Sequence, residues 1–163
     1  MTKTNAARIL DTAGIIYELF QYEVNESDLS AISVAHKLGQ DIDRVFKTLV
    51  LTGDKTGVFV CVIPGAEELD LKSAAKISGN KNAAMIPMKE ILSVTGYIRG
   101  GCSPIGMKKN YPTFIDESCI LYDFIFISAG IRGLQLKLAP EDLIRVTSCK
   151  PGDLIVIKNS LQS

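Results

Sequence analysis

Residues 44–63 read RVFKTLVLTGDKTGVFVCVI, and this stretch decides the fold. Its first nine residues alternate as a strand does, so that Lys47, Leu49 and Leu51 share one face. The glycine-bounded segment GDKTG in the middle has the composition of a hairpin turn. The last six residues are apolar and form the returning strand. The stretch therefore predicts a hairpin at the centre of the sheet.

Lys47 is out of place on this strand. An ammonium group on an apolar face loses hydration, and a counter-charge or a ligand is needed to offset that cost. The alternative is a side chain that reaches the edge of the sheet and buries only its apolar stem. The sequence alone favours neither interpretation.

Helix and strand patterns continue on both sides of the hairpin. Ser, Thr and Asp residues precede several helical patterns as N-caps, and glycines follow them as stops. We predict helices over residues 4–13, 30–38 and 71–78, from Pro87 to Val94, and from Pro140 onward. We predict strands over residues 15–24, 83–86, 113–116, 124–128 and 134–138, with a final strand or an extended tail at 153–158. This order indicates one α+β domain over residues 1–163, with a mixed, largely antiparallel central sheet surrounded by helices.

The composition is that of an ordinary globular protein of 163 residues. Lysine plus arginine and aspartate plus glutamate both number 18, so the net charge is zero. A protein that grips long nucleic acid through bulk charge is usually basic, so we expect contacts with one or two phosphates at most. The N-terminal residues lack the apolar core of a secretory signal, and no run is long and apolar enough to span a bilayer. We expect a cytoplasmic protein without a membrane partner.

The sequence offers little for metal binding or nucleophilic catalysis. Its four cysteines are widely spaced and His36 is its one histidine, so a zinc site of ordinary spacing is not expected. Cys102 lies in a glycine-rich loop, where a thiol needs a nearby base to act as a nucleophile. His36 is far away in the sequence. We expect no metal and no cofactor, and we keep a catalytic Cys102 as an alternative.

Residues 96–109 read GYIRGGCSPIGMKK and interrupt the regular patterns. Glycines let another molecule approach the backbone closely, and Gly-Gly before Ser-Pro indicates a constrained turn. Arg99 and the two lysines at the end add positive charge. Backbone N–H donors beside cations suit an anion or a carbonyl oxyanion, so we interpret the stretch as a binding loop. A purely structural loop is the alternative.

Several segments, in order along the chain, resemble the YbaK/EbsC family of aminoacyl-tRNA deacylases, which remove mischarged amino acids from tRNA. They are KTLV at 47–50, LDLK at 69–72, GY through GGCSPIG at 96–106, AGIRGL at 129–134 and LAPEDL at 138–143. The resemblance covers most of the chain. It implies the α+β fold of these editing domains, which prolyl-tRNA synthetases share.

The resemblance also implies site residues one by one. The strand lysine that the family most needs for activity falls on Lys47, and the tyrosine that lines its pocket falls on Tyr22. The Gly-Gly-x-Ser-Pro loop falls on Gly100, Gly101, Ser103 and Pro104. Arg99 and Arg132 become candidates for contacts with the tRNA end, with surface ion pairing as the alternative. Gln135 stands at a substrate-binding position where Cys-specific relatives carry an aspartate.

The implied reaction cleaves the ester between an amino acid and the terminal adenosine of tRNA, chiefly cysteine on tRNA(Pro) or tRNA(Cys). The thiol of the bound cysteine is thought to attack its own ester in this family, which suits a chain without a Ser-His-Asp set. Lys47 would hold the terminal phosphate or the developing negative charge, and the amides of Gly100 and Gly101 would hold the carbonyl oxygen. Prolyl-tRNA synthetase is the implied partner, since an uncharged chain should bind tRNA weakly alone.

Three alternatives stay open. Because Gln135 replaces a carboxylate, the chain could remove another small amino acid from tRNA(Pro). For the same reason it could be an inactive module that binds tRNA ends. The third alternative is a thiol enzyme that uses Cys102.

Overall fold

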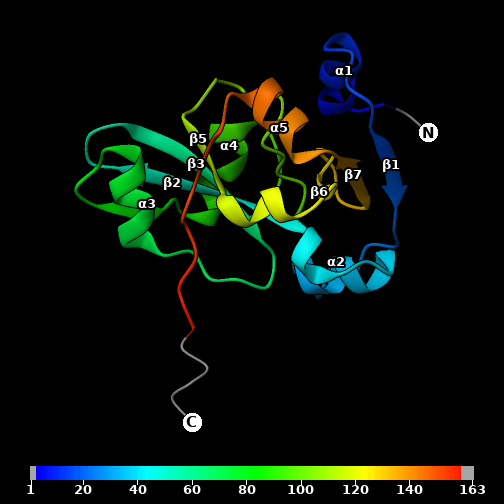
Figure 1. Cartoon of the computed structure of the whole chain (residues 1–163), viewed down its shortest axis with the longest axis horizontal. Coiled ribbons are helices and arrows are strands. Elements are labelled where there is room, and N and C mark those ends of the chain that lie inside the picture. Colours follow the sequence, from blue (N-terminus) through cyan, green and yellow to red (C-terminus); the bar gives the residue numbers. More distant parts are fainter. Residues whose placement is uncertain (1–2, 159–163) are drawn as a thin grey trace.

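The computed structural model describes residues 3–158, and the predicted hairpin lies at the centre of its larger sheet (Figure 1). The two strands are β2 (Phe46–Gly53) and β3 (Gly57–Pro64), which pair antiparallel along their whole length. The hairpin prediction is therefore confirmed. Lys47 is the second residue of β2 and lies opposite Ile63.

The strands form two sheets. The larger has the order β4 (Ala83–Met85), β2, β3, β5 (Thr113–Asp116) and β8 (Lys150–Gly152). The smaller has the order β1 (Glu18–Gln21), β7 (Leu134–Leu138) and β6 (Ile125–Ser128). β3, β5 and β8 run parallel to one another, and the other paired strands are antiparallel. A parallel bridge between Val45 and Phe126 joins the two sheets. The prediction of a mixed, largely antiparallel sheet in an α+β fold is confirmed.

Short helices surround the sheets, as predicted (Figure 1). They are α1 (Asn5–Thr12), α2 (Ala31–Leu38), α3 (Leu71–Ser78), α4 (Ile91–Thr95) and α5 (Pro140–Thr147), with 3₁₀ turns at Ile42–Arg44, Met88–Glu90 and Glu117–Leu121. Side chains of Thr4, Ser30 and Asp70 cap α1, α2 and α3 by accepting backbone amides. None of the helices within residues 3–158 combines the length and the apolar character that crossing a membrane requires.

The structure differs from the predicted elements in detail at three places. β1 occupies only the middle of residues 15–24. Pro87 precedes a 3₁₀ turn that leads into α4, so it lies before the helix rather than inside its first turn. Residues 153–158 form an extended tail, and the final strand is β8 instead. Pro151 in β8 lacks an N–H donor, which disfavours strands in general, but an edge position tolerates it.

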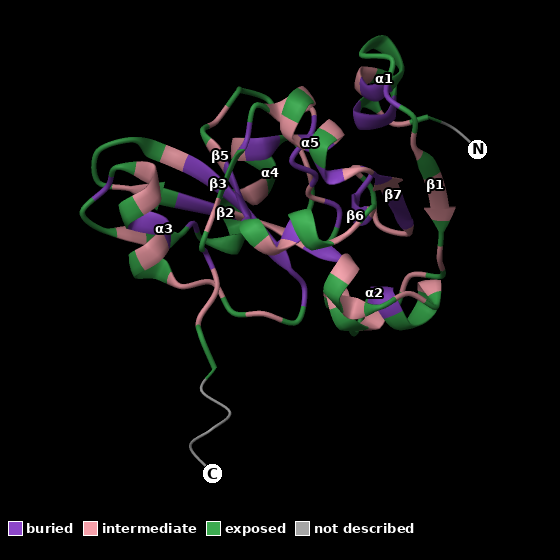
Figure 2. Ribbon diagram, viewed as in Figure 1, coloured by how far each residue is buried: buried purple, intermediate pink, exposed green. Residues whose placement is uncertain are grey.

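Buried side chains form three clusters. Figure 2 marks the buried residues in purple along the ribbon, many of them on the central strands. The first joins α1 and α5 to β3, β6 and β7. The second lies between α3 and the hairpin. The third lies between α2 and the bridge that joins the sheets, and it contains Val34, Ala35, Val45 and Phe126. α2 is therefore held against the point where the two sheets meet, next to Lys47.

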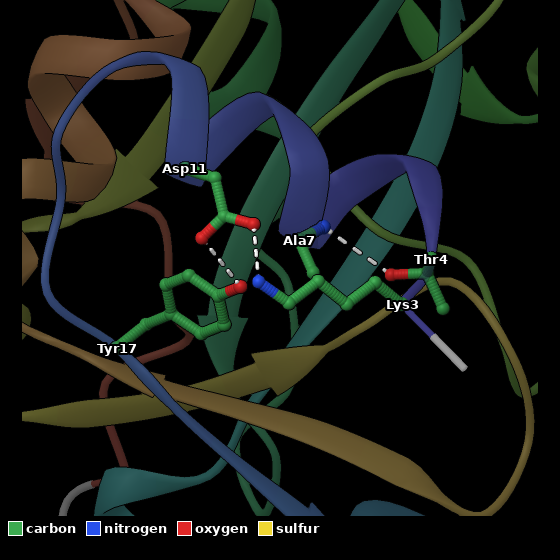
Figure 3. Close-up of polar contacts among 5 residues, drawn as sticks. All are labelled: Lys3, Thr4, Ala7, Asp11 and Tyr17. Carbon is green, nitrogen blue, oxygen red and sulfur yellow. Dashed lines mark hydrogen bonds and ion pairs between the residues drawn. The ribbon is translucent and has the colours of Figure 1, made fainter. Parts of the chain in front are cut away.

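Polar contacts hold α1 at both ends (Figure 3). Thr4 Oγ1 accepts the Ala7 amide at 3.2 Å. Near the other end, Asp11 accepts hydrogen bonds from Lys3 Nζ at 2.6 Å and from the Tyr17 hydroxyl at 2.8 Å. The hydrogen bond from Lys3 is the main cause that lowers the pKa of Asp11 below its ordinary value. These contacts tie the segments before and after α1 to the helix.

Candidate active site

A cavity of about 320 Å³ opens beside the start of β2. Its walls come from the N-terminus of α2, the first residues of β2, the glycine-rich loop and the paired strands β6 and β7. Its polar and reactive side chains belong to Ser30, Lys47, Thr48, Arg99, Cys102, Ser128 and Gln135. The structure thus brings together Lys47, Arg99, Gly100 and Gln135, four residues that the sequence predicts for the site.

Lys47 is half-buried in this wall without a charged partner at contact distance. Among residues 3–158 no carboxylate forms an ion pair with its ammonium group, although Glu67 and Glu68 act on it through space. Burial lowers the pKa of Lys47 below its ordinary value, and the two glutamates oppose that change. A bound anion would stabilise this partly desolvated charge.

The glycine-rich loop leaves the Gly100 amide available. Gly100 lines the cavity, and its backbone adopts the left-handed conformation with φ of 84°. Within residues 3–158 its amide has no hydrogen-bond acceptor. The Gly101 amide instead donates to the carbonyl oxygen of Ile98 at 3.0 Å. A Cβ at Gly101 would lie 3.1 Å from the backbone of Ile131, so only glycine fits there without displacement. The expected donor role of Gly101 does not fit this geometry, because its amide is already engaged.

Arg132 supports the loop from outside the cavity. Its Nε donates to the carbonyl oxygen of Arg99 at 2.8 Å, and its Nη1 donates to the carboxylate of Glu26 at 2.6 Å. One side chain therefore joins the segment after β1, the glycine-rich loop and the turn between β6 and β7. The ion pair predicted as the alternative for Arg132 is present.

Gln135 lines the cavity and carries a buried amide oxygen without a partner. It is the second residue of β7, and it lies opposite Ser128 of β6 and Phe20 of β1. The residue is 5% exposed, and its Oε1 has no hydrogen-bond partner. An unsatisfied buried acceptor costs about 1–3 kcal/mol. This oxygen has almost no accessible surface, so its missing partner is a cost within the fold and does not mark a ligand contact.

Tyr22, Ser103 and Pro104 do not line this cavity. Tyr22 and Arg132 line a separate hollow of about 640 Å³ at the end of β1. Pro104 lines another cavity of about 550 Å³, which α1 and the end of α5 also border. Ser103 is fully buried, and its hydroxyl accepts the Ile105 amide at 3.2 Å. The smaller cavity at Lys47 is nevertheless our candidate site, because the half-buried Lys47 and Gly100, whose amide is not engaged, both line it.

The sequence did not single out several residues of the cavity. Ser30 and Ala31, at the start of α2, bring the positive end of that helix to the site. Ser128 lies opposite Gln135 across the β6–β7 pair. Alternation along two strands joined by a short turn could have found Ser128, whereas the approach of α2 depends on tertiary packing.

Cys102 lines the cavity as a neutral thiol. Burial raises the pKa of Cys102 to about 11, so the thiolate is scarce at neutral pH. His36 is exposed on α2 and does not line the cavity. Within the described part of the chain, no three His, Cys, Asp or Glu side chains are grouped to hold a metal ion. Within the described residues, no histidine or carboxylate lines the cavity as a base for Cys102.

Comparison with known proteins reveals several relatives. Residues 27–146 match the family model described as the aminoacyl-tRNA editing domain. A protein of Enterococcus faecalis named "Putative Cys-tRNA(Pro)/Cys-tRNA(Cys) deacylase EbsC" is 51% identical over 146 residues, which are 90% of this chain and 89% of that protein. A Bacillus subtilis protein named "Uncharacterized protein YwhH" is 28% identical over 124 residues, which are 74% of this chain and 78% of that protein.

The fold also has counterparts among solved structures. One described as "a putative trans-editing enzyme for prolyl tRNA synthetase" matches with a TM-score of 0.81 and 24% identity, over 96% of this chain and 100% of that chain. Another, the hypothetical protein APE2540, matches with a TM-score of 0.83 and 21% identity, over 91% of this chain and 97% of that chain. At these identities the likeness establishes the fold.

Proposed function

The chain belongs to the aminoacyl-tRNA editing domain family, and we propose that it is a trans-editing deacylase that cleaves the ester of Cys-tRNA(Pro) and Cys-tRNA(Cys). The relative from Enterococcus faecalis supports these substrates, because it is 51% identical over nearly the whole chain and its name carries both. One observation supports the activity most strongly: the ammonium of Lys47 and the backbone of Gly100 line the same cavity.

The chemical step we propose uses the substrate's own thiol. The sulfur of the bound cysteine attacks the ester carbonyl carbon, the bond from that carbon to the ribose oxygen breaks, and the ribose oxygen takes up a proton. The thiol proton passes to solvent, and the cysteine leaves as a cyclic thioester that water later opens. The protein needs only to place the reacting atoms and to stabilise charge. This fits a cavity whose one thiol, Cys102, stays protonated.

We assign a separate task to each cavity residue. Lys47 holds the terminal phosphate or the negative charge that develops on the carbonyl oxygen. The Gly100 amide donates to the carbonyl oxygen, and Gly101 shapes the turn that positions this amide. Arg99 contacts the tRNA end at the mouth of the cavity. Tyr22 does not line the cavity, so we assign it to contacts with the tRNA end outside the amino-acid pocket.

The synthetase partner is a finer part of the proposal. The net charge of the chain is zero, and phosphate contacts supply most of the non-specific affinity for nucleic acid. We therefore propose that the protein acts beside prolyl-tRNA synthetase, which presents the charged tRNA in the cytoplasm. Adding the synthetase should lower the KM for Cys-tRNA(Pro) without changing kcat.

A panel of charged tRNAs tests the proposed function. Purified protein should deacylate Cys-tRNA(Pro) and leave Pro-tRNA(Pro) intact. Replacing cysteine with serine on the same tRNA should slow cleavage by about a hundredfold or more, because a hydroxyl is a far weaker nucleophile than a thiol at neutral pH. Rapid cleavage of Ser-tRNA(Pro) would contradict attack by the substrate thiol.

The uncharged Gln135 in the cavity favours a second candidate. Because the cavity lining includes no carboxylate, the chain could remove another small amino acid from tRNA(Pro) or bind tRNA ends without cleaving them. Faster cleavage of Ala-tRNA(Pro) than of Cys-tRNA(Pro) would favour the first of these. Binding without any cleavage across the panel would favour the second.

A further inference from the structure

Another hollow, of about 370 Å³, lies between the 3₁₀ turn Glu117–Leu121 and the extended tail that begins at Asp153. We call it the acidic hollow; Figure 1 shows the yellow turn beside the orange-red tail. Asp116 holds its two walls together, since Oδ1 accepts the Leu154 amide at 3.0 Å and Oδ2 accepts the Ser118 amide at 3.2 Å. Asp116 is only 2% exposed. The hollow is therefore preformed.

The acidic hollow exposes large aliphatic side chains. Ile120 and Leu121 line it and are 64% and 75% exposed, and Ile155 lines it from the tail. Ile157, two residues farther along the tail, is 81% exposed. Single exposed aliphatic side chains need no explanation, but a group of them around a hollow marks a surface that another molecule covers. Covering these side chains removes apolar area from water and so favours binding.

Carboxylates surround this apolar surface. Glu117 and Asp153 line the hollow, both are exposed, and neither forms an ion pair within residues 3–158. Glu68 is exposed on the segment that pairs with the tail. The neighbouring Lys150 and Lys158 are exposed as well but do not line the hollow. All the charged side chains of the lining are therefore acidic.

This combination determines what kind of molecule fits. Unpaired carboxylates repel the phosphates of tRNA and of anionic lipids, whereas they attract lysine and arginine. The complementary ligand is a protein segment that brings an apolar side chain to the hollow with lysine or arginine beside it.

The acidic hollow is separate from the Lys47 cavity, and the two linings share no residue. The 3₁₀ turn precedes β6, whereas Ser128, the last residue of β6, lines the Lys47 cavity. A protein bound at the acidic hollow therefore need not cover the cavity.

We infer that the acidic hollow is the docking site for prolyl-tRNA synthetase, which inserts an apolar side chain flanked by lysine or arginine. The inference rests on the proposed function, in which the synthetase presents the charged tRNA, and it names the surface of this chain that the synthetase contacts. Docked there, the synthetase holds the tRNA while the Lys47 cavity receives the aminoacylated end.

Calorimetric titration of the purified synthetase with the full chain, without tRNA, tests the docking site. Leu121→Ser removes the most exposed aliphatic side chain of the lining, and we expect the Kd to rise by about tenfold or more. Ile16→Ser is the matched control, because Ile16 is 88% exposed and lies outside the hollow. Its Kd should equal that of wild type. Leu121→Ser should still cleave free Cys-tRNA(Pro) at the wild-type rate, since Leu121 does not line the Lys47 cavity.

The salt dependence of the same titration tests the charge complementarity. The wild-type Kd should rise as the NaCl concentration increases from about 50 to about 300 mM, because salt screens exposed charges. The double variant Glu117→Gln with Asp153→Asn should bind more weakly at low salt and lose most of this dependence. Glu23→Gln with Glu90→Gln, which neutralises two exposed carboxylates outside the hollow, should behave as wild type.

Equal Kd values for Leu121→Ser and wild type, or no binding by wild type, would overturn the inference and leave the deacylase activity standing. Light scattering provides a further check. A wild-type dimer that Leu121→Ser converts to monomers would show that a second copy of the chain occupies the hollow, and this too would overturn the inference. If wild type binds the synthetase but cleaves no cysteinyl-tRNA, the proposed activity fails, and the titration still decides the docking site.

Discussion

Arg132 Nε donates a hydrogen bond to the carbonyl oxygen of Arg99 at 2.8 Å, across a separation of 33 residues in the sequence. The same guanidinium contacts Glu26 at 2.6 Å. A Cβ at Gly100 would lie 3.2 Å from Arg132 Nε, so the arginine packs directly against the loop that carries the Gly100 amide. The position of that amide in the cavity thus depends on a residue outside it.

Replacing Arg132 with lysine should slow catalysis more than it destabilises the protein. Lysine keeps the positive charge but cannot reproduce the two directional bonds of the guanidinium. We expect kcat on Cys-tRNA(Pro) to fall by about tenfold, because a misplaced amide loses its contact with the carbonyl oxygen. The free energy of unfolding should change by no more than about 1 kcal/mol.

Arg145→Lys is the control for this variant. Arg145 pairs with Asp142 at 3.4 Å on the exposed side of α5, away from the cavity. The Arg145→Lys variant should have the same kcat and the same melting temperature as wild type. Equal kcat values for Arg132→Lys and wild type would show that the loop does not need this support.

Asn80 should be a main support of the central hairpin. It is 7% exposed, and its Oδ1 accepts the amides of Lys55 and Thr56 at 2.8 and 2.9 Å. Asn80→Ala leaves two amides of the turn without their acceptor, so urea denaturation should show a loss of about 1–3 kcal/mol. Asn25→Ala removes a similar contact with Ser27 on an exposed loop and should cost less. A smaller loss for Asn80 than for Asn25 would contradict this role.

Cys102→Ser should retain nearly full deacylase activity. The Cys102 thiol lines the cavity, but its pKa of about 11 keeps it protonated at neutral pH, and the proposed reaction does not use it. Iodoacetamide should alkylate Cys102 slowly at pH 7, with a rate that rises toward pH 11 as the thiolate forms. Mass spectrometry measures the alkylation. Loss of activity in Cys102→Ser, with its folding intact, would instead support a thiol enzyme.

Lys47→Met should make the protein more stable at neutral pH. Burial lowers the pKa of Lys47 in the folded state, so the unfolded chain binds this proton more tightly. The resulting penalty is fully present below the lowered pKa and disappears as the pH rises toward about 10.5. The urea midpoint of Lys47→Met should therefore exceed that of wild type at pH 7, with a difference that shrinks as the pH rises.

Lys76→Met serves as the control for this stability test, since Lys76 is exposed on α3. The difference between the urea midpoints of Lys76→Met and wild type should not shrink as the pH rises. If Lys47→Met is less stable than wild type at pH 7, the prediction is wrong. The contacts of Lys47 would then stabilise the fold by more than the burial of its charge costs.

Local patterns predicted those parts of the fold that local interactions determine. The β2–β3 hairpin follows from alternation and from a glycine-bounded turn, and N-caps with glycine stops mark α1, α2 and α3. Lys47 on an apolar strand face was also visible as an anomaly in the pattern, but the pattern alone left a ligand and a side chain that reaches the sheet edge equally open. In contrast, β8 contains Pro151, which argues against a strand unless its edge position is known.

Tertiary contacts determine what the sequence left undetermined in the site. Glu26 and Arg132 are 106 residues apart, and no local pattern pairs them. The Gly101 amide resembles a free donor in the sequence, but the turn with Ile98 engages it. The proximity of Gln135 to Lys47 becomes apparent only when α2, β2 and β7 enclose one cavity.

Deacylation of Cys-tRNA(Pro) by Lys47→Ala, measured beside wild type and Lys76→Ala, tests the role of the cavity most directly. The ammonium of Lys47 is the one lysine charge in the cavity lining, and removing one contact to a developing oxyanion typically costs about a hundredfold in rate. We expect a loss of that order for Lys47→Ala, with a cooperative melting transition retained and with Lys76→Ala as active as wild type. A folded Lys47→Ala protein that cleaves Cys-tRNA(Pro) at the wild-type rate would contradict the assignment of this cavity as the active site.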